Sequence, residues 1–229
     1  RLSQMFNPKK TTYARVTYTD ISGLDGNSAK SGIGGSLLNH LSQMDGFIHV
    51  VRCFENDNVP HIYTTVDHQR DIATMDSEFI LNDLVVIERR LERLQDESRK
   101  GGSRDNNIID LETVLLEHLQ SALSEETPLR DLPLTHDEDK SISGYGFLSR
   151  KPILIVMNLG EGQDEPDFQY DHLHSRVVAL QGQLEMEIAQ LPVITRLIRL
   201  HRIISLMHAV LPLQTLAFIE SDHATTCNH

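Results

Sequence analysis

Short apolar runs rich in Val and Ile are the feature that most constrains the fold of this chain. Residues 46–54 (GFIHVVRCF) and 152–158 (PILIVMN) are the clearest, residues 176–180 (RVVAL) form a shorter run, and residues 11–21 alternate apolar with polar side chains. Runs of this length suit strands, and continuous apolar character is typical of parallel strands covered on both faces. Helical segments separate these runs, so the sequence predicts an α/β fold.

The block between residues 76 and 145 differs, because its apolar residues repeat at helical spacing. The first stripe advances in steps of four and three: Ile80, Leu84, Ile87, Leu91 and Leu94. This spacing predicts the seam of a coiled coil. A polar segment at residues 100–107 interrupts the pattern, and a second stripe follows: Ile108, Leu111, Leu115 and Leu119. We expect an antiparallel coiled-coil hairpin inserted between two sheet strands; the alternative is an ordinary amphipathic helix pair within one core.

Composition narrows the classes of function. With 33 acidic and 21 basic residues the net charge is -12, which disfavours broad electrostatic binding to nucleic acid, and direct DNA binding is not expected. No apolar run approaches the roughly 20 residues of a membrane span, so no membrane partner is expected. Cys53 and Cys227 are far apart and form no CxxC pair, which favours a reducing, cytoplasmic location.

The segment YTDISGLDG at residues 18–26 places Asp20 and Gly23 in an Asp-x-x-Gly pattern at the end of a predicted strand. In phosphate-binding nucleotidases such an Asp reaches Mg²⁺ through water, and the glycine N–H approaches the γ-phosphate because no side chain intervenes. In isolation, a simple strand-to-loop turn explains the pattern equally well. The order of parts strengthens it: a glycine-containing loop opens a helix, a strand follows, and Asn158 and Glu161 come after another strand. This order is the layout of a GTPase-type domain.

Several longer segments resemble the YchF/Obg-like ATPase family of P-loop proteins. They are DISGL, NHLSQMDGFIHVVRCFENDNVPHI, VDHQRDI, DSEFILNDL, IERRLERL and GFLSRKPILIVMNLGE. The resemblance extends from Arg1 to about Leu191 and is most specific at residues 46–94. It implies a Ras-like nucleoside triphosphatase (NTPase) domain with an inserted coiled-coil hairpin and a C-terminal TGS domain. It also implies a preference for ATP over GTP, use of Mg²⁺, and association with the ribosome and the translation machinery.

The resemblance divides the chain into four expected parts. Residues 1–75 would form the first part of the NTPase domain, and residues 76–145 the inserted coiled-coil hairpin. Residues 146–191 would form the second part of the NTPase domain, with its base-recognition loops, and residues 192–229 a divergent C-terminal tail.

The resemblance also assigns the residues on the phosphate side of the site. Asp20 corresponds to the Asp that reaches Mg²⁺ through water, and Gly23 to the residue that senses the γ-phosphate. Leu24 stands where Ras-type enzymes carry the glutamine that orients the attacking water. Because a leucine side chain cannot hydrogen-bond to water, slow hydrolysis is expected.

On the base side, Asn158, Leu159 and Glu161 correspond to the family's base-recognition loop. Gly182 and Gln183 correspond to the second base-side loop, whose backbone N–H groups would face the purine, although Gln181 stands where the family carries Ser. Guanine-reading loops carry Asp at the position of Glu161. The longer side chain therefore predicts that the loop has no reason to prefer guanine.

The chain also departs from the family. It contains no Gly-x-x-x-x-Gly-Lys-Ser/Thr pattern, and the first strand of the family's sheet accompanies that phosphate-binding loop. We therefore expect an incomplete sheet, in which two neighbouring strands lack a partner, and a piece of a longer protein or a degenerate gene product. Two functions stay open: an NTPase that acts as a translation switch, and a non-catalytic remnant whose helical hairpin binds a partner.

Overall fold

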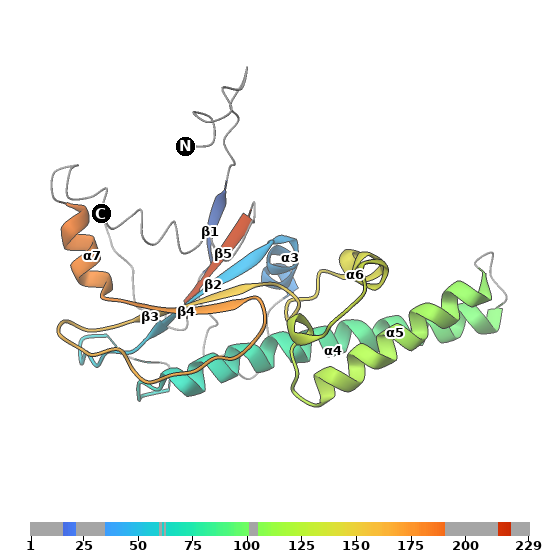
Figure 1. The fold of residues 1–229 in the computed structure, drawn as a ribbon, viewed down its shortest axis with the longest axis horizontal. Coiled ribbons are helices and arrows are strands. Elements are labelled where there is room, and N and C mark those ends of the chain that lie inside the picture. The colour runs from blue at the N-terminus through green and yellow to red at the C-terminus, as the bar shows by residue number, and fades with distance from the viewer. Residues whose placement is uncertain are drawn as a thin grey trace, which may run out of the picture.

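The computed structural model describes residues 16–21, 35–59, 61, 63–100, 105–190 and 215–220. A five-stranded sheet forms one end of the molecule, and two long helices extend away from it (Figure 1). The strands are β1 (Thr17–Ile21), β2 (Gly46–Arg52), β3 (Ile153–Asn158), β4 (Ser175–Leu180) and β5 (Thr215–Glu220). Their order is β1-β5-β2-β3-β4, and each neighbouring pair is parallel. The predicted α/β class with a parallel sheet is confirmed.

Alternation along the central strands explains why the sheet has apolar residues on both faces. Phe47 and Val51 of β2 join the core on one face, whereas Ile48 packs on the opposite face. In β3, Ile155 packs on the same face as Phe47, and Leu154 packs on the same face as Ile48. Successive side chains of a strand point to opposite faces, so a strand buried on both sides is apolar without interruption.

Strand β5 is where the structure differs most from the sequence-based expectation. Residues 192–229 were expected to be a divergent tail beside a sheet with a missing strand. Instead, Thr215–Glu220 lies between β1 and β2 and pairs in parallel with both, with Phe218 opposite Asp20 on one side and Ile48 on the other. A strand at this position satisfies backbone N–H and C=O groups of both neighbours, which would otherwise face each other across a gap. Among the described strands, the expected gap between β1 and β2 is therefore filled by β5.

Helix α4 (His68–Lys100) connects the two halves of the molecule. Its first part packs on the sheet beside α3 (Gly35–Gln43): Ile72, Met75 and Phe79 belong to the sheet-side core, which also contains Leu41 and Phe47. From Ile80 onward its apolar residues belong to a separate helical core. The helix thus runs through residue 76, the expected start of the insertion, and its packing changes between Phe79 and Ile80.

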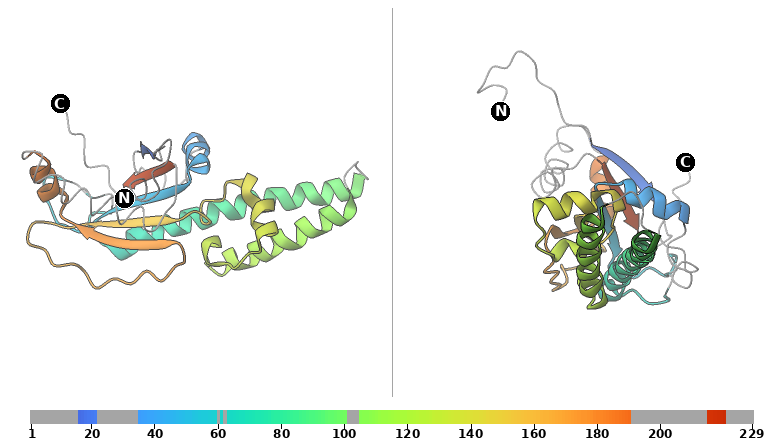
Figure 2. Two further views of the ribbon diagram at one scale, coloured as in Figure 1. Left: turned by 45° about the horizontal axis from the view of Figure 1, so that its top comes forward. Right: turned by 90° about the vertical axis from the view of Figure 1, so that its right-hand side faces the viewer.

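Helix α5 (Asn106–Ser124) packs along the distal part of α4, and together we call them the helical pair (Figure 2). The predicted stripe of α4 lies in their shared core: Ile80, Ile87 and Leu94 are buried, and Leu84 and Leu91 pack against them. In α5 the predicted stripe is partly wrong. Ile108 and Leu111 are exposed. Leu119 is buried and Leu115 packs against the core as predicted, and Ile109, Leu116 and Leu123 are buried as well.

Polar contacts join the helical pair to the sheet. The buried Asp83 of α4 accepts hydrogen bonds from the backbone N–H groups of Leu148 and Ser149, both at 2.8 Å, just before β3 begins. Arg130 follows α5 in the 3-10 helix η1 (Leu129–Asp131), and its side chain is fully buried. It donates to Asp76 at 2.7 Å and to the Tyr170 hydroxyl at 2.6 Å. We call these contacts the polar junction.

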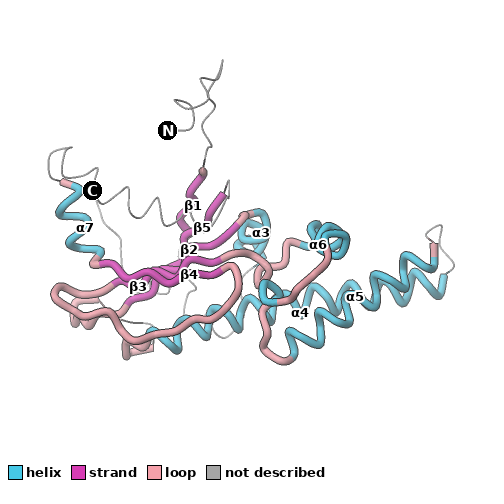
Figure 3. The backbone as a smooth tube through the Cα atoms, viewed as in Figure 1, coloured by secondary structure: helices cyan, strands magenta, loops and turns pink. Residues whose placement is uncertain are grey.

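The remaining elements are short. Helix α6 (His136–Ile142) and the 3-10 helix η2 (Ser143–Tyr145) lie between α5 and β3, and α7 (Gly182–Ala189) follows β4. The segment between β3 and β4 is a long loop (Figure 3), and its Phe168 and Tyr170 pack against the sheet-side core. None of the helices in the described part of the chain combines the length and apolar character of a membrane span.

Candidate functional site

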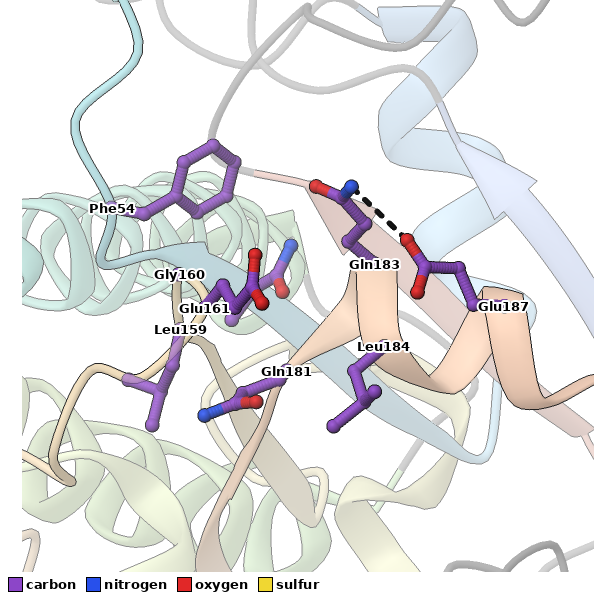
Figure 4. Close-up of a pocket in the computed structure, with 9 residues that line it drawn as sticks. Phe54, Leu159, Gly160, Glu161, Gln181, Gln183, Leu184 and Glu187 are labelled. Carbon is purple, nitrogen blue, oxygen red and sulfur yellow. Dashed lines mark hydrogen bonds between the residues drawn. The ribbon is translucent and has the colours of Figure 1, made fainter.

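The loops that follow β2, β3 and β4 meet at the edge of the sheet where these parallel strands end. They enclose a cavity of about 100 Å³. Its lining residues are Phe54, Asn158, Leu159, Gly160, Glu161, Gln181, Gln183, Leu184 and Glu187 (Figure 4). In parallel α/β sheets, ligands bind outside the carboxyl ends of the strands, where the loops from different strands converge. The cavity therefore lies where proteins with a parallel α/β sheet bind their ligands.

Asn158 joins the β3 loop to the start of α7. Its side-chain Oδ1 accepts a hydrogen bond from the Gly182 N–H at 3.0 Å, and the Leu159 N–H donates to the Leu180 carbonyl at 2.8 Å. A Cβ on residue 182 would lie 2.7 Å from this Oδ1. Glycine is therefore needed at residue 182 because a side chain would displace the asparagine that links the two loops.

Phe54 forms the aromatic wall of the cavity, and Arg52 fixes it in place. The Arg52 guanidinium donates to the carbonyls of Phe54 and Val59, both at 2.9 Å, and its Cζ lies 4.9 Å from the Phe54 ring centre. A cation at this distance from an aromatic ring is attracted to its face. Arg52 is also almost fully buried, so both the backbone and the ring of Phe54 are held by one side chain.

Gln163 ties the β3 loop to the β2 loop. Its Oε1 accepts from the Gly160 N–H at 2.9 Å, and its Nε2 donates to the Cys53 carbonyl at 2.7 Å. Between them, Gly162 has a positive φ of 68°, a conformation that favours glycine. Sequence analysis missed both Phe54 and Gln163. The signal for Phe54 was present, because it is an aromatic residue two positions after the end of β2, at the edge where ligands bind.

The five predicted base-side residues come together around this edge. Asn158, Leu159, Glu161 and Gln183 line the cavity, and Gly182 adjoins it through its hydrogen bond to Asn158. Leu159 is only 7% exposed and packs mainly in the sheet-side core, so only part of its side chain lines the cavity. Glu161 is exposed. Gln183 donates to Glu187 at 3.2 Å, along α7 (Figure 4).

Asp20 does not line the cavity, and in the sheet register it is level with Phe218, Ile48 and Leu154, four residues before Asn158 at the end of β3. It is exposed, near the end of β1. Three strand spacings separate β1 from β3, which corresponds to about 14 Å. Gly23 and Leu24 lie outside the described residues. An elongated ligand would be needed to reach both Asp20 and the cavity.

The described residues offer limited means to hold a metal. A carboxylate such as that of Asp20 is a hard oxygen donor that suits Mg²⁺. No group of three or more His, Cys, Asp or Glu side chains within the described ranges is arranged to hold a metal ion. Asp20 therefore fits a water-mediated contact to Mg²⁺ and would not bind the ion by itself.

Cys53 directly follows β2 and precedes Phe54 of the cavity wall. Burial raises the pKa of its thiol to about 11, and the charge of Asp71 adds to the effect. The thiol is therefore protonated near neutral pH and is a poor nucleophile, since the thiolate is the reactive form. The lining of the cavity suits binding through amide, backbone and aromatic contacts.

Comparisons with known proteins agree with this fold. No family model matches the chain. It is 31% identical over 202 residues to the ribosome-binding ATPase YchF of Bacillus subtilis, an alignment that covers 83% of this chain and 54% of the relative. The ribosome-binding ATPase YchF of Escherichia coli O157:H7 is 32% identical over 199 residues, again with 83% and 54% covered.

A solved structure supports the fold independently. The Schizosaccharomyces pombe YchF GTPase has a TM-score of 0.50 at 20% identity, with 83% of this chain and 43% of that chain covered. The chain spans about half the length of the curated relatives it matches. The similarity in sequence, together with the likeness in fold, shows that this chain belongs to the YchF/Obg-like family.

Proposed function

We propose that this chain supplies the base-binding side of an Obg-like NTPase that prefers ATP over GTP and acts in the cytoplasm as a switch on the ribosome. The observation that carries the proposal is the cavity between Phe54, Asn158 and α7 at the carboxyl edge of the sheet. The curated relatives are named ribosome-binding ATPases. An aromatic wall beside backbone and amide groups suits a flat purine ring with polar edges.

Preference for adenine follows from Glu161. In a guanine-reading loop, an Asp carboxylate accepts hydrogen bonds from N1–H and the 2-amino group, contacts worth roughly 1.5–3 kcal/mol each because the acceptor is charged. Adenine has neither donor at these positions. Glu161 is one methylene longer and exposed, so it can turn to solvent. An adenine base then meets no buried carboxylate that lacks a partner.

Asp20 and Gly23 are proposed to act on the phosphate side, with Mg²⁺ when it is bound neutralising phosphate charge. Asp20 would hold a water molecule of the ion's shell, which fits its position at the end of β1. Leu24 would leave the attacking water without a side-chain partner, and slow hydrolysis follows. No P-loop pattern occurs in the sequence, so we propose weak nucleotide binding for this chain alone.

The four-part division of the chain belongs to the same proposal. Residues 1–75 and 146–191 would form the NTPase domain, and residues 76–145 an inserted coiled-coil hairpin. The continuous core of the helical pair supports the insertion. Residues 192–229, the proposed tail, contribute β5 to the sheet. The non-catalytic alternative, a partner-binding remnant, draws support from the outer surface of α5, described below.

A titration with AMP and GMP, followed by amide NMR spectra, tests the base site. We expect AMP to shift the signals of Phe54, Gly160 and Gly182, with a dissociation constant of roughly 0.1 mM or weaker. Glu161→Asp should move the preference toward GMP by about tenfold, or ~1.4 kcal/mol. Gly182→Ala should abolish the shifts, because its Cβ would collide with Asn158 Oδ1.

The controls distinguish a base site from general affinity. Ribose 5-phosphate, which lacks a base, should leave these three signals unmoved. Gly144→Ala is the matched glycine control, since a Cβ there meets nothing within 4 Å, and it should bind like the wild type. Equal shifts with ribose 5-phosphate, or AMP shifts confined to other surfaces, would contradict the proposed function.

A further inference from the structure

Helix α5 has apolar residues on two faces, and only one of them is covered. Its inner face contributes Ile109, Leu116, Leu119 and Leu123 to the helical core. On its outer face, Ile108 is 50% exposed, Leu111 73% and Val114 65%. At about 100° per residue, these three side chains fall within an arc of roughly 120° over two turns. Scattered exposed apolar residues are common, but a stripe on one helix face is typical of a contact surface.

Acidic residues accompany this stripe. Asp110 and Glu117 are exposed and, seven residues apart, lie on the same side of the helix beside Val114. Glu112 points the other way and binds Arg90 of α4 at 2.7 Å. The sequence from Asp105 to Glu126 contains no Lys or Arg. The outer face of α5, defined by Ile108, Leu111 and Val114 with Asp110 and Glu117, is therefore apolar and negatively charged.

The outer face is also accessible. Figures 1 and 2 show the start of α5 at the far end of the helical pair, away from the sheet. Residues 106–108 and 110–111 are all exposed, which agrees with these views. A partner could therefore approach without displacing any described element.

The charges decide among possible occupants. A second copy that used the same face would bring acidic side chains opposite acidic side chains, since a symmetric contact places the same patch on both subunits. Along α4, the exposed large apolar residue is Leu81, near the sheet end of the helix, so α4 of another copy offers no matching stripe. Nucleic acid would be repelled by the carboxylates of Asp110 and Glu117, since the described residues of α5 include no Lys or Arg.

We propose that the outer face of α5 docks a basic amphipathic helix of another protein. Apolar side chains of that helix would cover Leu111 and Val114, and its Lys or Arg residues would pair with Asp110 and Glu117. Pairing of an amphipathic helix through anchors three and four residues apart is a recurrent mode of recognition. The stripe is short, so the contact is weak and reversible, with a dissociation constant on the order of 10–100 µM.

The test uses the full chain and a synthetic helical peptide of about 15 residues, with Leu on one face and Lys on the other. Fluorescence anisotropy measures binding to the labelled peptide. Leu111→Ser with Val114→Ser should weaken binding at least about fivefold, as should Asp110→Lys with Glu117→Lys, a loss of ~1 kcal/mol in each case. Circular dichroism should show unchanged helix content, because the replaced residues are exposed.

Matched controls address the general attraction between a basic peptide and an acidic protein. Leu81→Ser removes an apolar residue of α4 that is 55% exposed, and Glu88→Lys with Glu92→Lys reverses two exposed charges of α4. Both controls should bind the peptide within about twofold of the wild type.

Four results would overturn the proposal. One is equal weakening by the α4 controls, and another is equal binding of a peptide with Glu in place of Lys. The third is binding of a mixed-sequence single-stranded RNA at this face, detected as competition with the peptide. Sedimentation that shows self-association, lost in the Leu111→Ser and Val114→Ser variant, would instead assign the face to a second copy. None of these results bears on the base cavity, which the nucleotide titration tests separately.

Discussion

The sheet and the helical pair share one helix, but they are held together in different ways. In the sheet, strands that are distant along the sequence pair side by side: Phe47 lies opposite Ile153 and Ala217. The helical pair consists of two helices joined by a short segment, with its own core around Ile87 and Leu116. A unit built from neighbouring segments closes with less loss of chain entropy than one built from distant strands. The helical pair should therefore fold more independently than the sheet.

Buried polar side chains lie where the sheet-side core and the helical core meet. Phe79 ends the sheet-side core along α4 and Ile80 begins the helical core. Between the regions, Asp83 and Arg130 make the hydrogen bonds of the polar junction. Buried charged groups that are hydrogen-bonded favour one arrangement, because a shift that breaks these bonds leaves a charge without a partner. The junction thus fixes how the helical pair is oriented relative to the sheet.

The largest effect is expected when the polar junction is broken. Arg130→Met leaves Asp76 and the Tyr170 hydroxyl without their buried cation, and removing one partner of a buried ion pair costs roughly 3–5 kcal/mol. Urea unfolding followed by circular dichroism measures the change. The control is Lys100→Ala, because Lys100 and Asp96 form an exposed pair at 3.5 Å; it should change stability by less than about 0.5 kcal/mol. A loss below about 1 kcal/mol in the Arg130 variant would contradict a structural role for the junction.

A cavity in the helical core should have a smaller and more local effect. Leu116 is fully buried, and Leu116→Ala should cost about 3 kcal/mol. If the helical pair opens as its own unit, hydrogen exchange should accelerate in residues 106–124 while β2 and β3 stay protected. Phe79→Ala is the matched change in the sheet-side core, and it should accelerate exchange in β2. Uniform acceleration in both variants would show that the two regions unfold as one.

The smallest effect is expected in the pH dependence of the free energy of unfolding, through a buried histidine of the sheet. His49 of β2 is fully buried, and neither ring nitrogen has a hydrogen-bond partner among the described residues. Burial lowers its pKa from 6.5 to about 4, partly offset by the charge of Asp76. The folded state therefore keeps the His49 ring neutral. Above pH 6.5 the ring is neutral in both states and does not lower the stability of the fold. As the pH falls from 6.5 toward 4, the ring is protonated in the unfolded state only, and the folded state loses stability.

We expect the free energy of unfolding to fall by about 2 kcal/mol between pH 7.5 and 5 through this group. His49→Leu should remove that part of the dependence, whereas His136→Gln, which changes an exposed histidine of α6, should retain it. Urea unfolding at the two pH values measures the difference. Identical pH dependence in the wild type and His49→Leu would mean that His49 is not the sensitive group.

Much of the site could be predicted from the sequence, because its parts lie beside strong local signals. Asn158 lies at the end of an apolar run that suits a buried strand and Glu161 follows it, while Gly182 follows a second such run. Resemblance to a family then supplied their shared role. Phe54 and Gln163 were missed because their importance depends on contacts between loops: Gln163 bonds to Cys53, which is distant in the sequence. The burial of Leu159 could not be predicted for a similar reason, since it depends on the sheet-side core.

The sequence by itself determined the central strands and the apolar stripe of α4. Short apolar runs indicate strands, and apolar residues three and four apart indicate a helix, and both patterns are local properties of the chain. For α5 the sequence predicted a single apolar stripe, of which Leu115 and Leu119 belong to the shared core. Only the tertiary structure decided which face meets α4, since Ile109 and Leu116 are buried whereas Leu111 is exposed. The same holds for β5: a run such as Thr215–Glu220 becomes an inner strand only because β1 and β2 leave backbone groups on both sides for it to bond. Such choices are made by contact energies between distant segments, which no local pattern contains.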